Sequence, residues 1–256
     1  MRRLSKLFRE DGNMVVVAMD HGLGLNVNPA LDDIGAKLRA IVKGGADAIL
    51  TTYGIARKYE DILKDVNLIL RVDGGNSCLN GDDFCQDQMF DIEDALRIGA
   101  DAIICMGFPG SSYEHQSLKQ LADYCRKGDA MGIPVMAEML PGGFSPAIPN
   151  SIENLVVAAH TGCECGAHII KTAFAGDAES YKKVIAASYQ PVIVLGGEAT
   201  SELSSLYLCI EQAMTAGARG VAIGRNVWKS TDPEGVTRNL VRLVHEGAKA
   251  SELKTV

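Results

Sequence analysis

Lys171 lies near the end of a short apolar run, residues 167–172, with the sequence Ala-His-Ile-Ile-Lys-Thr. The run contains β-branched residues and follows Gly166, a pattern typical of a fully buried strand that ends near the lysine. Burial disfavours the charged ammonium group, so such a lysine tends to lose its proton and become a nucleophile. A neutral amine in an apolar pocket can form a Schiff base with a ketone. The competing interpretation is a lysine that simply extends into solvent.

Carboxylate and imidazole groups near the ends of other apolar runs could transfer protons. Asp20 and His21 directly follow the first such run, and Glu138 lies in the fifth. Asp20 could hold or deprotonate a substrate hydroxyl, and His21 could carry a proton near neutral pH. A structural hydrogen bond is the simpler role for His21. Glu138 could relay protons to Lys171, or it could form an ion pair that keeps the lysine charged.

The last two apolar runs are each followed by glycine, at Gly196 and Gly197 and at Gly224, and Arg225 comes directly after Gly224. Glycines in these positions allow backbone N–H groups to approach an anion closely. Arg225 can add a bidentate, charge-assisted contact. We therefore predict a binding site for the phosphate of a ligand. Glycines that only make tight turns are the alternative interpretation.

Short apolar runs recur at regular intervals and predict parallel strands. They span residues 14–19, 48–52, 66–72, 102–106, 133–139, 167–172, 192–195 and 220–223. Apolar residues at three- and four-residue spacing predict helices between them, over residues 29–43, 92–98, 117–131, 152–162, 178–187 and 203–216. Strands that are apolar on both faces and alternate with helices indicate a parallel sheet. Eight such units in about 250 residues match an α/β fold of the closed (β/α)8 type, the TIM barrel.

A doubly wound open sheet is the alternative α/β fold. That fold usually carries a G-x-G-x-x-G fingerprint after its first strand, whereas residues 20–24 have the sequence Asp-His-Gly-Leu-Gly. No linker or low-complexity tract interrupts the chain, so we expect one barrel domain over residues 1–256 with a short N-terminal helix.

In a barrel the active site lies at the C-terminal ends of the strands. Besides the candidates above, polar residues at these ends are Thr51, Thr52, Tyr53 and those of the segments 73–77, 107–112 and 196–200. The loop 140–149, with three prolines and two glycines, follows the fifth predicted strand. We expect this loop to be functional.

The composition excludes several classes of protein. A net charge of -7 argues against a nucleic-acid or membrane-surface partner, and no apolar stretch reaches the roughly 18 residues that a membrane span needs. Seven irregularly spaced cysteines favour a reduced, cytoplasmic protein over a disulfide framework. The Cys-x-Cys motif at 163–165, although flanked by histidines, lacks the usual spacing of a structural zinc site. We expect no metal ion and no other cofactor.

Together these motifs resemble the class I, Schiff-base aldolase family, which includes archaeal-type fructose-1,6-bisphosphate aldolase, deoxyribose-phosphate aldolase and the autoinducer-2 phosphate thiolase. The resemblance extends from residue 6 to residue 247 and is carried by the segments 19–22, 109–111, 169–172, 175–177, 196–197 and 224–228. It implies that Lys171 is the Schiff-base lysine, that Asp20 contacts a substrate hydroxyl, and that the glycine-rich loops with Arg225 bind phosphate. It also implies a phosphorylated sugar substrate and a ring-shaped homo-oligomer, often a decamer.

The chain departs from the archaeal aldolase pattern at three places. Leu140 stands where those enzymes carry a tyrosine that donates a proton, and leucine cannot do so. The segment 196–200 is Gly-Gly-Glu-Ala-Thr instead of Gly-Gly-Pro-Lys-Thr, which removes a cation. The segment 71–77 is more similar to the thiolase branch.

Three functions are therefore considered. The first is a Schiff-base aldolase that cleaves or forms a carbon–carbon bond in a phosphorylated ketose, with His21 or Glu138 in place of the missing tyrosine. The second is a coenzyme A-dependent thiolase that acts on a phosphorylated diketone. The third is a non-catalytic barrel that binds a phosphosugar.

Overall fold

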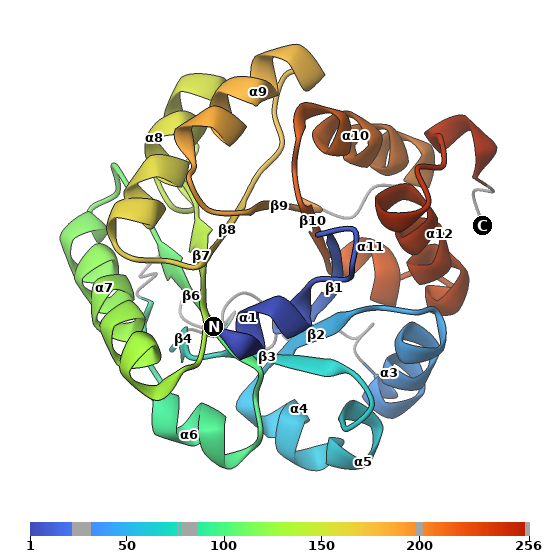
Figure 1. Ribbon diagram of the computed structural model, residues 1–256, viewed down its shortest axis with the longest axis horizontal. Helices are drawn as coiled ribbons and strands as arrows, with labels where there is room; N and C mark the ends of the chain where they lie inside the picture. The colour runs from blue at the N-terminus through green and yellow to red at the C-terminus, as the bar shows by residue number, and fades with distance from the viewer. Residues whose placement is uncertain (22–31, 76, 78–85, 198–201, 254–256) are drawn as a thin grey trace.

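A closed barrel of parallel strands organises the protein. The computed structural model describes residues 1–21, 32–75, 77, 86–197 and 202–253. Eight strands pair in the order β1-β10-β9-β8-β7-β6-β3-β2, and the ring is closed (Figure 1). They are β1 (Met14–Met19), β2 (Ala48–Thr51), β3 (Asn67–Arg71), β6 (Ala102–Gly107), β7 (Val135–Met139), β8 (Ile169–Thr172), β9 (Val192–Leu195) and β10 (Gly220–Ile223). The predicted (β/α)8 barrel is confirmed, and the doubly wound alternative is wrong.

Helices form an outer ring around these strands (Figure 1). They are α3 (Ile34–Lys43), α4 (Tyr53–Lys58), α5 (Glu60–Leu63), α6 (Ile92–Arg97), α7 (Glu114–Met131), α8 (Ile152–Glu164), α9 (Ala178–Ala187), α10 (Leu203–Ala216), α11 (Arg225–Trp228), α12 (Pro233–His245) and the 3-10 turn η2 (Ala250–Glu252). The helices α4, α5, α11 and α12 were not predicted, and of these α4, α5 and α11 are too short to show a helical period. In the described part of the chain, no helix combines the length and apolarity that crossing a bilayer requires.

Local signals in the sequence set where the helices begin and end. Asp177 begins α9 by accepting a 2.8 Å hydrogen bond from the Ser180 backbone N–H, and the Ser180 side chain bonds back to Asp177. This reciprocal capping satisfies backbone donors that the first helical turn leaves free. Gly132 and Gly217 end α7 and α10 with φ of 69° and 108°, conformations that favour glycine. The chain then returns to the next strand.

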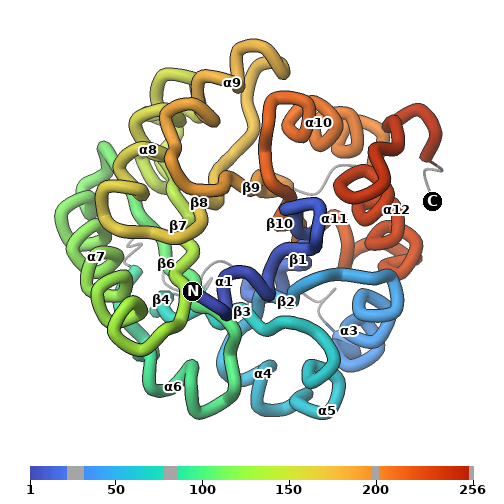
Figure 2. Tube along the Cα trace, viewed as in Figure 1, coloured from blue at the N-terminus to red at the C-terminus, as the bar shows by residue number. Residues whose placement is uncertain are grey.

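The helix α1 (Arg2–Leu7) closes one end of the barrel. Leu7 is fully buried, and Leu4 and Phe8 pack against the apolar cluster inside the barrel. Lys6 adds a 2.8 Å ion pair with Asp101. Figures 1 and 2 show α1 lying across the opening of the ring. The opposite end, where the strands terminate, therefore remains for the candidate site.

Side chains inside the barrel form two layers of opposite character. The lower layer is an apolar cluster that comprises Met14, Val16, Ala18, Ala48, Leu50, Ile69, Ala102, Ile104, Met136, Ile169, Ile193 and Ala222. Because alternate residues of a strand share a face, the next inward positions on β3, β7 and β8 are Arg71, Glu138 and Lys171, which are all buried. An ionisable layer therefore lies directly above the apolar one.

A short ribbon that the sequence did not predict lies beyond β3. Strand β4 (Asp73–Gly74) pairs antiparallel with β5 (Asp87–Gln88). The backbone N–H groups of Met89 and Phe90 both donate to the Val72 carbonyl oxygen, at 2.9 and 3.0 Å. The ribbon thus returns the chain to the mouth of the barrel.

Candidate active site

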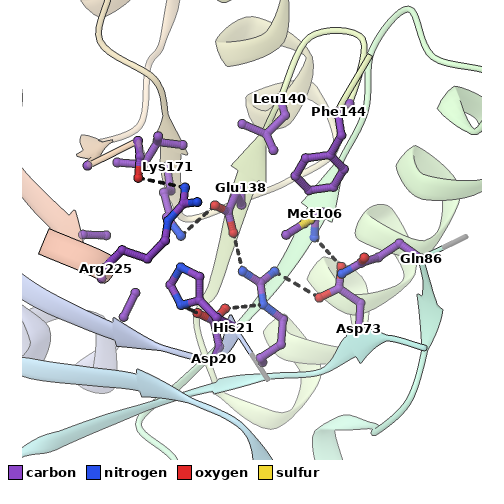
Figure 3. A pocket seen from close by; sticks show the side chains of 18 of the residues that line it. Asp20, His21, Asp73, Gln86, Met106, Glu138, Leu140, Phe144, Lys171 and Arg225 are labelled. Carbon is purple, nitrogen blue, oxygen red and sulfur yellow. Dashed lines mark hydrogen bonds and ion pairs between the residues drawn. The ribbon is translucent and has the colours of Figure 1, made fainter. Parts of the chain in front are cut away.

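A cavity of about 250 Å³ opens at the C-terminal ends of the barrel strands (Figure 3). Its lining comes from β1, β3, β6, β7 and β8 and from the segments that follow β7, β9 and β10. The residues predicted to be catalytic or to bind phosphate all line it: Asp20, His21, Glu138, Lys171, Gly196, Gly197, Gly224 and Arg225. The fold thus gathers the candidate nucleophile, proton-transfer groups and anion-binding residues in one place.

Lys171 is only 4 % exposed, so the solvent-extended alternative is wrong. Its Nζ lies 2.7 Å from Glu138 Oε1, and the two residues are register partners on the adjacent strands β8 and β7. The Thr172 hydroxyl on β8 donates a 2.8 Å hydrogen bond to the Met139 carbonyl oxygen on β7. This bond links the two strands beside the lysine. The surroundings of Lys171 are therefore ionic rather than the apolar pocket that the sequence suggested.

Arg71 is the central residue of this ionic layer, and the sequence reasoning did not select it. The side chain is 2 % exposed. Its Nε donates to Asp20 Oδ2 at 2.8 Å and its Nη1 to Asp73 Oδ1 at 3.1 Å, while Nη2 donates to Glu138 Oε2. The five donors of a guanidinium suit such divided pairing. Arg71 therefore links three buried carboxylates from different strands.

The cations determine the charge state of the carboxylates. Burial raises the pKa of Asp20, but attraction to Arg71 and then to Lys171 and His21 outweighs burial and lowers it to about 2. Burial likewise opposes the lowered pKa of Glu138, which results from Lys171 and Arg71. Both groups are therefore carboxylates at neutral pH.

Asp73 differs from these two carboxylates. Burial raises its pKa and is only partly offset by Arg71 and by the Met106 backbone N–H, which donates to Asp73 Oδ2 at 2.7 Å. Among the described residues no cluster of His, Cys, Asp or Glu could hold a metal ion.

His21 lies beside the carboxylate pair as a neutral imidazole. Its Nδ1 is 3.8 Å from Asp20 Oδ1 and has no hydrogen-bond partner among the described residues. Burial lowers the pKa of His21, with Asp20 opposing and Lys171 and Arg225 adding to that effect. The ring contacts Trp228 edge to face, with 5.4 Å between the ring centroids. A purely structural hydrogen bond at Nδ1 is thus not found in the described part of the chain.

Glycine is required beside His21. A Cβ atom on Gly224 would lie 2.5 Å from His21 Cε1 and 2.8 Å from the Ala18 carbonyl oxygen. The Trp228 indole N–H donates to the same carbonyl at 3.1 Å. The missing side chain at Gly224 therefore lets the loop after β10 approach the imidazole.

The loops after β9 and β10 are tied together at the other side of the cavity. Arg225 Nη2 donates to the Gly197 carbonyl oxygen at 2.9 Å, and Asn226 Nδ2 donates to that of Gly196 at 3.3 Å. Arg225 Nε is buried and has no hydrogen-bond partner in the described residues. Gly197 has a φ of 62°, which favours glycine. Residues 198–200 lie outside the described residues.

Other strand-end residues suggested by the sequence serve the scaffold. The Thr51 hydroxyl donates to the Met19 carbonyl oxygen, Thr52 caps α4, and Tyr53 stacks on Phe90. None of these three residues lines the cavity. Thr51 lies on the face of β2 opposite to the inward Leu50, and Thr52 and Tyr53 form the start of α4. In the loop 140–149, Leu140, Gly143 and Phe144 line the cavity, and a functional role for this loop stays a prediction.

A parallel (β/α)8 barrel with ionisable groups at the C-terminal ends of its strands has the architecture of a barrel enzyme. The chain belongs to the DeoC/LacD family of aldolases, whose family model matches residues 14–230.

Individual relatives agree with this assignment. The chain is 34% identical over 247 residues to 2-amino-3,7-dideoxy-D-threo-hept-6-ulosonate synthase of Halobacterium salinarum, covering 96% of this chain and 91% of the relative. It is 29% identical over 252 residues to 3-hydroxy-5-phosphonooxypentane-2,4-dione thiolase of Klebsiella pneumoniae, covering 98% and 82%.

Among solved structures, an archaeal fructose 1,6-bisphosphate aldolase matches with a TM-score of 0.88 and 28% identity, covering 96% of this chain and 99% of the other. A second archaeal structure, with a TM-score of 0.87 and 27% identity, has its catalytic lysine bound to a carbinolamine intermediate and covers 95% and 98%. The present chain is therefore an aldolase of the Schiff-base type, and the non-catalytic alternative is not retained.

Proposed function

We propose that the protein cleaves or forms the carbon–carbon bond between the α and β carbons of the ketone in a phosphorylated ketose, the C3–C4 bond of a 2-ketose, and that Lys171 is its Schiff-base lysine. One observation carries this proposal. The buried Lys171 amine contacts the Glu138 carboxylate in the same cavity that holds Gly196, Gly197 and Arg225. A nucleophile with a proton acceptor beside it and an anion site in reach is the arrangement that this chemistry needs.

In the direction of cleavage, the Lys171 amine adds to the ketone carbon. Loss of water from the resulting carbinolamine gives a protonated iminium. The bond between C3 and C4 breaks, and its electron pair moves into the iminium to form an enamine. The C4 hydroxyl loses its proton and leaves as an aldehyde. Protonation of the enamine at C3 and hydrolysis then release the second product and restore the amine.

Two side chains are proposed to transfer protons, and a third is proposed to orient the substrate. Glu138, in contact with Lys171, accepts a proton from the ammonium group and returns one to the departing water. Asp20 is ionised and orients the C4 hydroxyl. His21 is a neutral imidazole at neutral pH, so it can take the hydroxyl proton and substitute for the tyrosine missing at Leu140.

The phosphate is proposed to bind between the loops after β9 and β10. Arg225, which lines the cavity, already donates to the Gly197 carbonyl oxygen through Nη2, and its Nε has no hydrogen-bond partner among the described residues. Backbone N–H groups of glycine-rich loops at this position of a barrel are suited to phosphate.

A second candidate is acyl transfer from a phosphorylated diketone to coenzyme A. It is favoured by Leu140 in place of a proton donor and by the similarity to the Klebsiella pneumoniae thiolase. Turnover that requires coenzyme A would distinguish it from aldol cleavage.

We also propose that the protein is a cytoplasmic homo-oligomer, on the basis of its aldolase family and its irregularly spaced cysteines. Light scattering on the purified full chain tests the assembly, and a monomer at micromolar concentration would contradict it.

The proposed function is tested by assaying bond cleavage and formation with ketose phosphates, with and without coenzyme A. Lys171→Met should lower kcat/KM by at least about a thousandfold, because covalent catalysis is lost. Lys182→Met, which alters an exposed lysine on α9, should leave the rate unchanged. Full activity of Lys171→Met would contradict the proposal, and activity only with coenzyme A would favour the second candidate.

A further inference from the structure

The two ends of the cavity differ in chemical character. In Figure 3, Arg225 and Lys171 lie at one side, Gln86 and Asp73 lie at the other, and Glu138 lies between them. A ketose phosphate with its phosphate near Arg225 and its ketone at Lys171 would direct its remaining carbons toward Gln86. The aldehyde half of the substrate therefore belongs at that end.

Gln86 is a buried amide for which the described residues supply no hydrogen-bond partner. It lines the cavity and is 5 % exposed. Neither its Nε2 nor its Oε1 has a hydrogen-bond partner among the described residues. Buried amide groups are nearly always hydrogen-bonded in folded proteins. An unpaired donor and acceptor that face a cavity are therefore positioned to pair with what the cavity binds.

The fold holds Gln86 at this position. It directly precedes β5, which pairs with β4, and the backbone N–H groups of Met89 and Phe90 donate to the Val72 carbonyl oxygen. These contacts anchor the backbone on the C-terminal side of Gln86 to the end of β3. The backbone that carries the Gln86 amide is therefore fixed by hydrogen bonds on its C-terminal side.

Charge at this end disfavours a second phosphate. Of the described residues that line the cavity, the lysines and arginines are Arg71, Lys171 and Arg225. Arg71 already pairs with three carboxylates, and Lys171 pairs with Glu138. The sequence segments 22–31, 76, 78–85 and 198–201 contain no lysine or arginine. A phosphate beside Gln86 would therefore meet the acidic side chain of Asp73 and no uncommitted cation.

We propose that Gln86 is a specificity-determining residue that hydrogen-bonds the uncharged polar end of the aldehyde, so that the aldehyde substrate carries no phosphate. A primary amide can donate to a hydroxyl or carbonyl oxygen and accept from a hydroxyl, which matches a hydroxyaldehyde. The inference rests on the proposed function and refines it. The ketose then carries one phosphate, on the ketone side of the bond that breaks.

The test uses the full chain with dihydroxyacetone phosphate as the ketone and two aldehydes that differ only in phosphate. The wild type should join D-glyceraldehyde with a kcat/KM at least about tenfold above that for D-glyceraldehyde 3-phosphate. Gln86→Leu should lower the D-glyceraldehyde value about tenfold, the effect of one or two lost hydrogen bonds. Gln88→Leu is the matched control, since Gln88 is exposed on the same ribbon, and it should match the wild type.

Two further measurements separate this inference from the proposed function and from a structural role. Borohydride trapping of dihydroxyacetone phosphate without aldehyde tests the ketone half alone, and Gln86→Leu should leave it unchanged. Because the described residues leave the amide unpaired in the free protein, Gln86→Leu should melt at the same or a higher temperature. A structural role predicts a lower one.

Each outcome has a definite meaning. If dihydroxyacetone phosphate and related ketone phosphates all fail to be trapped, the proposed function fails, and this inference falls with it. If the ketone is trapped but the wild type prefers D-glyceraldehyde 3-phosphate, only the inference on the aldehyde is overturned. It is overturned equally if Gln86→Leu leaves the D-glyceraldehyde value unchanged or lowers the melting temperature.

Discussion

The two layers inside the barrel are built by the same strands and serve different ends. Ile69, Met136 and Ile169 lie in the apolar layer, and two residues further along the same strands come ionisable groups. Burying a Met or Ile side chain stabilises the fold by roughly 1.5–3 kcal/mol. Burying a charge costs free energy unless a partner offsets it. The upper layer therefore persists because its charges pair with one another.

Among the substitutions in the two layers, we expect Arg71→Met to lower the free energy of unfolding most. It would leave the carboxylates of Asp20, Asp73 and Glu138 without their shared guanidinium. Removing one partner from a buried ionic network costs about 3–5 kcal/mol in the free energy of unfolding. Chemical denaturation measures this loss.

The matched control is Arg97→Met. Arg97 is 65 % exposed in its side chain and pairs with Asp94 on the surface of α6. We expect little change in the free energy of unfolding, since surface ion pairs contribute little. Equal effects of the two substitutions would contradict the central role of Arg71.

The second largest effect is expected on the pH dependence of the free energy of unfolding. The pKa of Asp20 is lowered in the folded protein, to about 2 from 3.8, so its ionised form contributes stability that is fully present above pH 3.8. This contribution, on the order of 2 kcal/mol, is lost as the pH falls through the folded value. Asp20→Asn should therefore flatten the dependence of unfolding free energy on pH between about pH 4 and 2. Identical slopes for variant and wild type would contradict the assignment.

Ile69→Val, a substitution in the apolar layer, is expected to have the smallest effect on stability and activity. Ile69 is fully buried, two residues before Arg71 on β3. Removal of one methylene group there should cost about 1 kcal/mol of stability. The kcat/KM should stay within twofold, because the site above keeps its ion pairs. A tenfold loss of activity would show that the layers are not independent.

The sequence predicts the barrel well because the strands are short and apolar and alternate with segments of helical period, several of which end at glycine. Lys171 and Glu138 were suggested by their positions near strand ends, and their contact follows from the register of β7 with β8. Arg71 was missed although the signal is present. Ile69, Arg71 and Asp73 share one face of a strand with period two, so an inward arginine could have been inferred.

Other features depend on tertiary contacts that no local pattern carries. Gln86 reaches the cavity because β5 pairs with β4 and the chain bonds back to Val72. The ionic surroundings of Lys171 arise from residues that are 100 and 33 positions away in the chain, Arg71 and Glu138.

A single domain over all 256 residues stays a prediction.

The most direct test of the central claim is to locate the covalent adduct. The full chain is incubated with dihydroxyacetone phosphate, reduced with borohydride, digested and mapped by mass spectrometry. We predict that the peptide with Lys171 gains the mass of the ketone less one oxygen, and that Lys171→Met abolishes the adduct. An adduct on another lysine, or none with any ketose or ketone phosphate, would contradict the account.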